Sequence, residues 1–502
     1  MSNLSELLPS GGGQNLVEFV ASGTLPNGKP VILNSNGTVT VVAGSGSAES
    51  IPNGVEVTVT ASGSEYMCLQ FDPNIANKFI LAYRDQDNSD ACTAVVGTVS
   101  GGAITFGSEQ VINTGGQNNH IDISFDPNTA GKFIVGYSLY VSAAATQYGY
   151  VVVCTYSGTT ITAGTPAVFH SGTSTYIALS YDPNTANKFI VVFRGSSNYG
   201  QSKIGTVSGT SISYGSSQNF NSGTTERISI SFDPNTSGKF VVGYKDSAST
   251  NRVTVRGASY TGTTVTYGTV AQPQTGAGQY TKVSYDLNTA GKFVLAFTNN
   301  ADGDKGYSYI CTQASNDSVT FGTAVIFESG QVYHMDLAFS TVANNFIVTY
   351  RDVGTSNNGT ANVGVVSGTG ITYGTKAVYN AGNSYDNRIA IDPNSAGHFA
   401  VGYMDYGAGG SAPSKAITGV INTLTTNLTS TNLIGITSEA TSSGGTAKIN
   451  TWGGINEAQT SLTIGSDYYA QTDGTITTVS TSPAQKVGTA ISATTINMKD
   501  LT

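Results

Sequence analysis

The chain has 502 residues and a formal net charge of −9, and only 11% of its residues are charged. This balance excludes the basic surface that nucleic-acid binding requires, and the sequence contains no apolar run long enough to span a membrane as a helix. Glycine supplies 61 residues, a proportion that favours turn-rich β structure assembled from repeats over one large compact core.

The N-terminal segment, residues 1–52, begins MSNLSELLPSGGG, which has neither the basic nor the apolar section of a secretory signal. We therefore expect the protein to be made in the cytoplasm. Further along, VILNSNGTVTVV from Val31 predicts a hairpin, because an Asn-Gly pair between two β-prone runs is a strong turn signal. The four cysteines of the chain are scattered without close pairs, so we expect small buried side chains and neither disulfides nor a zinc site.

One phrase then recurs seven times. Its copies are FDPNIANKFILAY from Phe71, FDPNTAGKFIVGY from Phe125, YDPNTANKFIVVF from Tyr181, FDPNTSGKFVVGY from Phe232, YDLNTAGKFVLAF from Tyr285, FSTVANNFIVTY from Phe339 and IDPNSAGHFAVGY from Ile391. Successive turn positions are separated by 54, 56, 51, 53, 54 and 52 residues. A nearly fixed period of this size indicates a solenoid, a propeller or an array.

Each copy predicts two strands joined by a tight turn. Asp-Pro-Asn forms turns because Pro presets φ while Asp and Asn bond to nearby backbone, and the apolar run after it suits a strand covered on both faces. A second hairpin follows in each period, as in KIGTVSGTSISYG from Lys203. Each unit of about 53 residues therefore holds four strands, the size of a propeller blade.

The first hairpin occurs seven times, but the second is complete only six times. After the last copy only the strand KAITGVIN (residues 415–422) remains, whereas NGVEVTVTASG (residues 53–63) aligns with FGSEQVINTGG (residues 106–116). We infer that this N-terminal strand completes the last blade and closes the ring, which removes most exposed strand edges. The predicted fold is all-β, with a seven-bladed β-propeller over residues 53–422; a linear solenoid is the alternative.

The two flanks, residues 1–52 and 423–502, resemble each other. YYAQTDGTITTV from Tyr468 repeats the strand, turn and Thr-rich strand of the N-terminal flank. Because the chain enters and leaves a closed propeller at one blade, we expect both flanks to form one small β domain that anchors the propeller. Two independent tails are the alternative. The only tryptophan, Trp452, is expected in the core or an interface of that domain.

The loops between the second and third strands of each unit vary from copy to copy. They are rich in Tyr, Ser, Asn and Gly, the composition of adaptable recognition surfaces, and we place them on the face opposite the repeated turns. This variable face is the expected ligand-binding surface; solvated connecting loops are the alternative. The candidate ligand-binding residues are Tyr140, Tyr148, Tyr199, Asp246, Asn300, Asp302 and Asp352.

Two of these loops carry several side-chain oxygens close together in sequence. RDQDNSD contains Asp85, Asp87 and Asp90, and NNADGDK contains Asp302 and Asp304. Alternating oxygens suit calcium, which takes six to eight hard ligands, so these residues are the candidate metal ligands and calcium the candidate cofactor. Neither loop completes the twelve-residue calcium pattern with its terminal glutamate, and a solvated acidic turn is the alternative.

We expect a non-enzymatic protein, with no catalytic residue. The four histidines lie in different repeats, away from any acidic or nucleophile motif, and no carboxylate pair can be assigned to glycoside hydrolysis. One phenylalanine recurs at the same place in all seven copies, from Phe79 to Phe399. Packing between blades explains this recurrence better than a stacking platform for a ligand, because each sheet must bury both of its faces.

The quoted segments resemble virion structural proteins of tailed bacteriophages, particularly marine phages. The resemblance rests on LPNGKPVILNSNGTVTVV, on NLIGITSEATSSGGTAKINTWGGINEAQTSLTIGSDYYAQTDGTITTVS, and on the repeated VGTVSGTSISYG and DPNTAGKFIVGY. It covers nearly the whole chain. It implies a tail fibre, appendage or head-decoration protein on the virion surface, made in the host cytoplasm and present as a homo-oligomer or in multiple copies.

This resemblance, taken with the variable face, predicts a receptor-binding component that contacts a host surface glycan or protein. The other expected partners are virion structural proteins; we expect no nucleic acid and no membrane insertion. A purely architectural capsid decoration or connector protein is one alternative. A glycan-degrading propeller enzyme is another.

Overall fold

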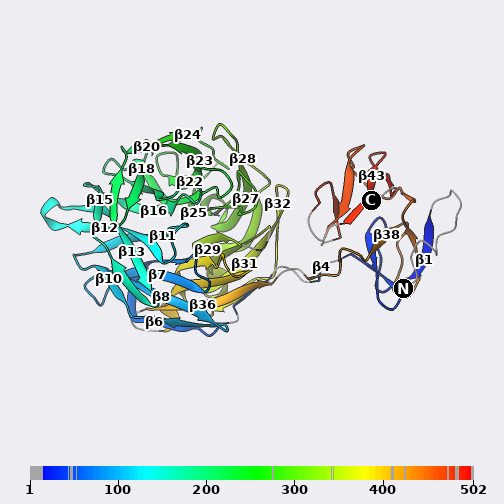
Figure 1. Cartoon of the computed structure of the whole chain (residues 1–502), viewed down its shortest axis with the longest axis horizontal. Coiled ribbons are helices and arrows are strands. Elements are labelled where there is room, and N and C mark those ends of the chain that lie inside the picture. The colour runs from blue at the N-terminus through cyan, green and yellow to red at the C-terminus, as the bar shows by residue number, and fades with distance from the viewer. Residues whose placement is uncertain are drawn as a thin grey trace. The chain divides into compact units, whose positions relative to one another are not determined.

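The computed structural model describes residues 15–42, 44–45, 49–52, 54–273, 276–340, 342, 344–408, 412–422, 425–471, 474–480 and 485–498. These residues form β-strands, turns and short 3-10 segments, and none of them lies in an α-helix, so the chain is all-β as predicted. Within them no helix is long and apolar enough to cross a membrane. The chain divides into two compact units, Ala48–Thr423 and a second unit of Met1–Ser47 with Leu424–Thr502 (Figure 1).

The larger unit contains seven antiparallel repeats of one design. In the second repeat, β11 (Asn118–Phe125), β12 (Lys132–Val141) and β13 (Thr146–Ser157) pair in chain order. Two short segments, β14 (Thr160–Ala163) and β15 (Ala167–His170), then pair side by side with β13 as an interrupted fourth strand. Each repeat therefore holds the two predicted hairpins.

The same four positions are occupied around the unit. The first strands are β6 (Val57–Phe71), β11, β16 (Thr175–Tyr181), β21 (Thr225–Phe232), β25 (Gly278–Tyr285), β29 (Val325–Phe339) and β34 (Ser384–Ile391). The second strands are β7 (Lys78–Asp85), β12, β17 (Lys188–Arg194), β22 (Lys239–Asp246), β26 (Lys292–Asn299), β30 (Asn345–Asp352) and β35 (His398–Asp405). The third strands are β8 (Ala91–Ser100), β13, β18 (Gly200–Ser208), β23 (Arg252–Thr261), β27 (Lys305–Gln313), β31 (Asn358–Ser367) and β36 (Pro413–Asn422).

The fourth strands complete each repeat. They are β9 (Ala103–Phe106) with β10 (Gln110–Asn113), β14 with β15, β19 (Ser211–Tyr214) with β20 (Gln218–Asn221), β24 (Thr264–Tyr267), β28 (Val319–Phe321) with the start of β29, β32 (Gly370–Tyr373) with β33 (Ala377–Asn380), and β5 (Glu49–Pro52) with the start of β6. Strands β6 and β29 are long because each ends one repeat and begins the next.

The last repeat takes its fourth strand from the N-terminal side of the chain. Thr58 and Thr60 of β6 pair with Lys415 and Ser414 of β36, and β5 pairs with the end of the same strand. This is the predicted strand exchange between the N-terminal segment and the last repeat; residue 53, where the predicted strand starts, lies outside the described residues. The exchange joins the first and last repeats of the chain.

The first strands pack against one another in an unbroken circuit. β6 contacts β11, each following first strand contacts the next, and β34 contacts β6. Figure 1 shows β11, β16, β25 and β29 near the middle of this unit, with β10, β15, β20 and β24 toward its outside. Among the described residues no hydrogen-bonded sheet closes on itself. Side chains bridge the sheets instead: Ser124 accepts a hydrogen bond from the Tyr181 N–H at 3.0 Å, which caps an edge of β16.

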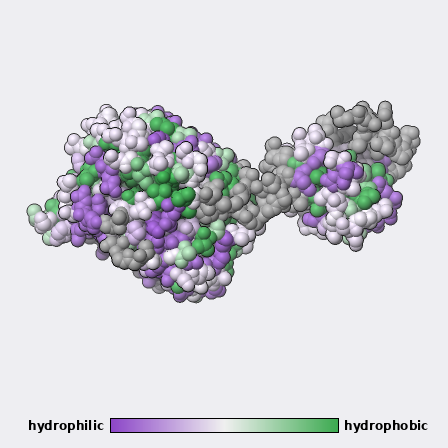
Figure 2. Space-filling view, turned by 90° about the horizontal axis from the view of Figure 1, so that it is seen from below, coloured by the Kyte–Doolittle hydropathy of each residue, from purple (hydrophilic) through white to green (hydrophobic). Residues whose placement is uncertain are grey.

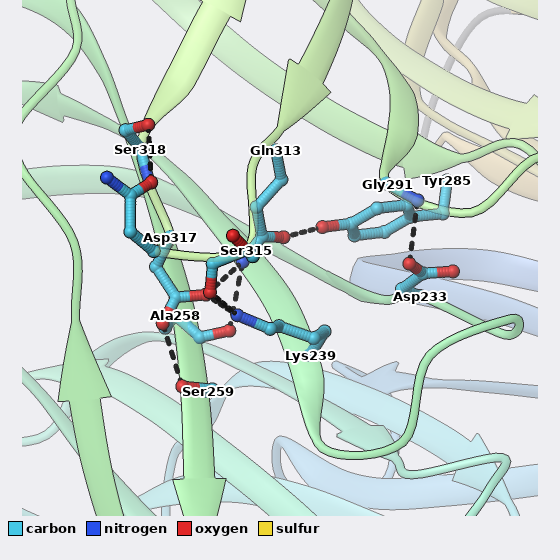
Figure 3. Close-up of polar contacts among 11 residues, drawn as sticks. Asp233, Lys239, Ala258, Ser259, Tyr285, Gly291, Gln313, Ser315, Asp317 and Ser318 are labelled. Carbon is cyan, nitrogen blue, oxygen red and sulfur yellow. Dashed lines mark hydrogen bonds and ion pairs between the residues drawn. The ribbon is translucent and has the colours of Figure 1, made fainter.

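The repeated Asp-Pro-Asn turn joins neighbouring repeats. One carboxylate oxygen of the buried Asp72 accepts the Asn74 N–H at 2.7 Å, and the other accepts the Gly131 N–H of the next repeat at 2.8 Å. Figure 3 shows an equivalent bond between the fourth and fifth repeats, from Gly291 to Asp233. At these joints one carboxylate satisfies both its own turn and the turn beside it, which accounts for the aspartate of the phrase there.

Lysines after these turns reach the other repeated turn. Lys239 of the fourth repeat donates to the Ser315 carbonyl at 2.7 Å, in the turn between the third and fourth strands of the fifth repeat (Figure 3). Lys78 makes the equivalent contact with Gly158 at 3.3 Å. Both kinds of repeated turn therefore lie on one side of the unit, and the variable loops lie on the other.

The recurring phenylalanines fill the core between sheets, as predicted. Phe79, Phe133, Phe189, Phe240, Phe293, Phe346 and Phe399 are at most 1% exposed. The ring of Phe79 lies where a side chain on Gly97 would point, so the glycine of the second hairpin makes room for it. All four cysteines, Cys68, Cys92, Cys154 and Cys311, are free, and they are buried side chains as predicted.

The smaller unit is built from both ends of the chain. One sheet has the order β1 (Leu16–Val20), β39 (Thr446–Asn450), β38 (Leu433–Thr437), β2 (Pro30–Leu33) and β3 (Val39–Val41). The other has the order β40 (Ile455–Asn456), β44 (Ile496–Asn497), β43 (Gln485–Ala490), β41 (Asp467–Ala470) and β42 (Ile476–Thr477), and a short pair joins β4 (Gly44–Ser45) to β37 (Thr425–Thr426). One core contains residues from both flanks, including Ile32 and Tyr468, and the half-buried Trp452 packs against it.

Both hairpins predicted in the flanks are present in this unit. β2 pairs with β3 and β41 pairs with β42. Gly37 and Gly474, the glycines of the two turns, have φ of 82° and 78°, a conformation that glycine adopts without strain. Local turn chemistry therefore determines these two elements.

Candidate functional site

The first strands of the seven repeats line one cavity of about 780 Å³. In the first repeat, the lining extends from Tyr66, near the start of the part of β6 that serves as first strand, to Pro73 in the Asp-Pro-Asn turn. The other repeats contribute residues at equivalent positions. The first strands start on the variable-loop side and end at the repeated turns. At each depth of the cavity, every repeat therefore contributes one equivalent residue to the wall. The mouth of the cavity lies among the variable loops.

Seven residues at this mouth share an unusual backbone conformation. Each lies at a β-bulge where the register between the first and second strands shifts, as between Glu65 and Cys68 in β6. Their φ values lie between 48° and 54°, in the left-handed region that residues other than Gly, Asn and Asp rarely adopt. We call them the mouth ring: Tyr66, His120, Tyr176, Arg227, Tyr280, His334 and Asp386.

The mouth ring is costly for the folded protein. A left-handed side-chain-bearing residue costs on the order of 1 to 3 kcal/mol and persists only where the surrounding structure fixes it. Bulges re-aim side chains, and all seven of these residues line the cavity. By contrast, the left-handed positions of the repeated turns hold Asn or Gly, for example Asn77 and Gly131. Seven side chains on left-handed backbone therefore face the cavity, whereas the repeated turns use Asn or Gly at such positions.

Aromatic rings form one half of the mouth. His120 lies between Tyr66 and Tyr176, with ring centroids 5.0 Å and 5.2 Å away. Arg84 lies over the ring of Tyr66 at 5.2 Å, and Arg194 lies over Tyr176 at 4.8 Å, both within the range of cation–π attraction. Carboxylates pair with both arginines: Glu65 with Arg84, and Glu226 with Arg194 at 3.5 Å.

The other half repeats this arrangement with different charge. Tyr280, His334 and Tyr385 form a row with centroid separations of 5.4 Å and 4.7 Å. Arg227 lies over Tyr280 at 4.4 Å, at one end of the row, and Arg351 lies over Tyr385 at 4.2 Å, at the other end. Five of the seven arginines of the chain lie in or beside the cavity mouth: Arg84, Arg194, Arg227, Arg351 and Arg388.

Charged side chains continue below the mouth ring. Lys282 pairs with Asp336 at 2.9 Å, and Arg388 pairs with Asp386 at 2.9 Å. Asp122 accepts the Leu179 N–H at 2.8 Å, and burial raises the pKa of its carboxyl to about 6. The interior is therefore polar and able to hold water or a polar ligand.

The two histidines of the ring stay uncharged near neutral pH. Burial lowers the pKa of His120 to about 3 and that of His334 to about 4. Nearby arginines act in the same direction on both rings, while Asp386 opposes them at His334. These imidazoles therefore contribute flat, neutral, hydrogen-bonding surfaces to the mouth.

The residues predicted from the sequence lie on the variable loops and are spread around them. Tyr140 is exposed, and Tyr148 and Tyr199 are half-buried. Asp246 accepts the Ala248 N–H at 3.2 Å in its own turn, while Asp352 is buried and pairs with Lys376 at 3.5 Å. Asp352 thus stabilises the scaffold and is closed to solvent. The face shown in Figure 2 mixes hydrophilic and hydrophobic residues over the larger unit, so hydropathy alone does not single out one loop.

The acidic loops carry their own partners. Asp302 pairs with Lys305 at 3.0 Å and accepts the Tyr307 hydroxyl at 2.6 Å. Asp304 accepts the Tyr333 hydroxyl at 2.7 Å, and so holds the loop of Asn300 against the mouth.

The first acidic loop is similar. Asp90 pairs with Arg84 at 3.4 Å, Asp85 accepts the Asn88 N–H at 3.3 Å, and Asp87 is exposed. Across the described residues no three His, Cys, Asp or Glu side chains are grouped as ligands for one metal ion. Calcium binding by these loops therefore stays a prediction, and no cluster of ligands among the described residues supports it.

The mouth ring was not found by sequence reasoning, although a signal exists. Each ring residue lies six positions before the turn position of its repeat, as His120 does before Asp126 and His334 before Ser340. At that offset every repeat has Tyr, His, Arg or Asp. A polar or aromatic residue at a fixed position inside an otherwise apolar first strand is the pattern that indicates a lined cavity.

Comparison with known proteins shows a likeness in fold to one lectin structure. No protein-family profile and no curated protein matches the chain. Among solved structures, the BP39L lectin from Burkholderia pseudomallei superposes with a TM-score of 0.54 over 73% of this chain and 98% of the lectin, at 10% sequence identity. At that identity the likeness concerns the fold alone.

Two further structures match less well. A protein of unknown function from Dyadobacter fermentans has a TM-score of 0.45 and 12% identity, covering 73% of this chain and 98% of its own. Sqt1 from Saccharomyces cerevisiae has a TM-score of 0.44 and 10% identity, covering 75% of this chain and 100% of its own.

Proposed function

We propose that the larger unit is a seven-bladed β-propeller in which each repeat is one blade. Three observations support this: the repeats share one four-stranded design, their first strands pack in a circuit around a common cavity, and the N-terminal strand completes the last repeat. A propeller leaves only short, protected strand edges. Its loops are held on a rigid frame, which is where recognition surfaces commonly lie.

We further propose that this propeller recognises a saccharide at the cavity mouth and does not alter it. The observation that carries the proposal is the mouth ring, in which seven strained residues present aromatic, imidazole and charged side chains to one cavity. Aromatic faces and hydrogen-bonding side chains are the groups that hold polar, ring-shaped ligands. BP39L is a lectin, and sharing its fold makes saccharides the first class of ligand to test.

Binding without cleavage is favoured by how the cavity carboxylates are held. Asp336 and Asp386 are each held by a cation in an ion pair, with Lys282 and Arg388 respectively. Asp122 is the exception, because a pKa of about 6 would suit a general acid. Glycan cleavage is therefore the second candidate function, with Asp122 as the residue to examine.

We propose that this recognition takes place on a particle surface, because the sequence resembles virion proteins of tailed phages. The smaller unit would attach the chain to other virion proteins, and several copies per particle would convert weak single-site binding into strong attachment. A head-decoration or connector protein, whose loops contact virion proteins only, is the architectural alternative.

A saccharide array probed with the purified full chain tests the proposal. We expect binding to a subset of glycans, and a strong decrease when Tyr280 is changed to Ala. Val168→Ala, at an exposed position outside the cavity lining, is the control and should bind as the wild type does. If the protein binds no glycan on the array, but an antibody detects it on virus particles, the architectural alternative would be favoured. Cleavage of a bound glycan that is lost in Asp122→Asn would establish an enzyme.

A further inference from the structure

Two arginines at the cavity mouth are left without an acidic partner. Arg227 and Arg351 each lie over a tyrosine ring, and in the part of the chain that the structure describes neither has a carboxylate within ion-pair distance. The deeper cations of this half are neutralised, because Lys282 pairs with Asp336 and Arg388 with Asp386. A positive charge from two guanidinium groups therefore remains at this part of the mouth.

The two guanidinium groups differ in burial. Arg227 is exposed. The Nε–H of Arg351 is buried and has no hydrogen-bond partner, a state it shares with the Nε–H groups of Arg84 and Arg252, and a buried charged donor without an acceptor costs free energy. Arg351 also lies over the ring of Tyr333, at 5.2 Å, so two rings fix the plane of its guanidinium group. The guanidinium group of Arg351 is therefore held in a fixed orientation with a free N–H donor, and can donate to an acceptor on a bound ligand.

Aromatic rings connect the two arginines. From Arg227 the row passes through Tyr280, His334 and Tyr385 to Arg351, with each neighbouring pair 4.2 to 5.4 Å apart. The row is built on three consecutive repeats, the fifth, sixth and seventh, with Arg227 supplied by the fourth. A ligand along this row would meet aromatic groups in the middle and guanidinium groups at both ends.

We propose that this half of the mouth binds a saccharide bearing an oxyanion, a carboxylate or a sulfate, with Arg227 and Arg351 as its charge partners. The inference rests on the proposed saccharide binding and specifies its chemical class. Guanidinium groups donate two parallel hydrogen bonds to planar oxyanions, and sugar C–H faces pack on aromatic rings. The neutral histidine in the row adds no competing charge.

The other half of the mouth has similar arginines and tyrosines but a different charge balance. Arg84 and Arg194 also lie over tyrosines there, but carboxylates balance the cations of that half: Glu65 and Asp90 pair with Arg84, and Glu226 pairs with both Arg194 and Lys245. An anion approaching that side would meet those carboxylates. The asymmetry assigns the oxyanion to the side of Arg227 and Arg351. A single strand of nucleic acid also combines rings with anions, but its backbone needs many cations along a groove, and this chain has a net charge of −9.

Calorimetry with the full chain and matched probe pairs tests the assignment. The carboxylate arm uses oligogalacturonate and its fully methyl-esterified form, which share one backbone and differ in charge. The sulfate arm uses a sulfated galactan oligosaccharide and its desulfated form. We expect at least one anionic probe to bind about tenfold or more tightly than its neutral partner, with an affinity that falls as salt rises from 50 to 500 mM.

Three variants identify the partners. Arg227→Asn removes the charge and places there a residue that tolerates the left-handed backbone. Arg351→Lys keeps the positive charge but removes the planar guanidinium group. Each should lose about tenfold in affinity for the anionic probe and little for the neutral one. Arg252→Gln is the control, because Arg252 bonds to Gln272 at 3.0 Å and lies outside the cavity lining. It should bind as the wild type does, and thermal melting should show that all three fold.

The outcomes separate this inference from the function on which it rests. Equal affinity for charged and neutral partners, or equal losses in Arg227→Asn and Arg252→Gln, would overturn the charge assignment and leave saccharide binding intact. Tighter binding of a single-stranded oligonucleotide than of any saccharide would replace the ligand class. Binding of no saccharide, charged or neutral, would remove the proposed function itself.

Discussion

The side-chain amide of Asn394 donates a hydrogen bond to the main-chain carbonyl of Asp72, 3.0 Å away and 322 residues earlier in the chain. Asn74 makes the same bond to the Asp126 carbonyl of the next repeat, at 3.2 Å. The last repeat is thus joined to the first by the bond that joins adjacent repeats. We call this contact between neighbouring repeats the joint, and the repeated phrase forms part of it. The phrase is similar in each repeat because the joint has a similar geometry wherever two repeats meet.

The joint predicts a large effect for Asp392. Its buried carboxylate accepts the Asn394 N–H at 2.9 Å and the Asn77 N–H of the first repeat at 2.8 Å. Asp392→Ala would leave both donors unsatisfied, so we expect the free energy of unfolding to fall by about 2 to 4 kcal/mol. Urea denaturation measures this. Asp87→Ala, at an exposed position, should change it by no more than about 0.5 kcal/mol; equal losses in the two variants would contradict the joint.

Packing between the second and third strands predicts the next effect. A Cβ on Gly97 would overlap the ring of Phe79, and the same relationship links Gly205 with Phe189. We expect Gly97→Ala to destabilise the protein by about 1 to 3 kcal/mol, the usual cost of overpacking a core. Phe79→Leu should recover part of this loss in the double variant, as a double-mutant cycle would measure. Gly370→Ala is the control, because its nearest neighbour would lie 3.5 Å from the new Cβ.

The elements that could be predicted from the sequence are those with local causes. Asp-Pro-Asn turns, the apolar run through Phe79 and the Asn-Gly hairpin at Gly37 follow from turn chemistry and strand patterning. The strand exchange of residues 57–63 followed from counting hairpins. The left-handed conformation of Tyr66 could not be predicted, because it depends on the register shift against β7, and no glycine marks it. The pairing of Asp352 with Lys376 depends on strand pairing across a repeat in the same way.

The ring histidines predict a loss of stability on the acid side. Burial lowers the pKa of His334 to about 4; Asp386 opposes this shift, and Arg351 and Arg227 reinforce it. The folded protein therefore keeps His334 neutral while the unfolded chain takes up a proton below about pH 6.5, so the contribution of His334 is present above that pH and lost as pH falls toward 4. His334→Asn, which tolerates the left-handed backbone, should reduce the stability lost between pH 7 and pH 5 by about 2 kcal/mol. Denaturation curves for both proteins at each pH measure this; parallel profiles would contradict it.

Asp122 predicts the opposite slope over part of the same range. Burial raises the pKa of its carboxyl to about 6, against the hydrogen bond from Leu179 and the charge of Lys282, which lower it. The folded protein holds this proton more tightly than the unfolded chain, so the contribution of Asp122 is greatest below about pH 4 and is lost as pH rises through 6. Asp122→Asn keeps an acceptor for the Leu179 N–H and removes the titration. Its stability relative to the wild type should therefore increase by about 2 kcal/mol between pH 4 and pH 7.

The control for this titration is Ser217→Ala, at an exposed position whose side chain does not ionise. Its stability relative to the wild type should stay constant over the same pH range. If Asp122→Asn also stays constant, the carboxyl ionises as easily in the folded protein as in the unfolded chain. In that case Asp122 could not serve as a general acid near neutral pH, and the second candidate function would lose the residue on which it depends.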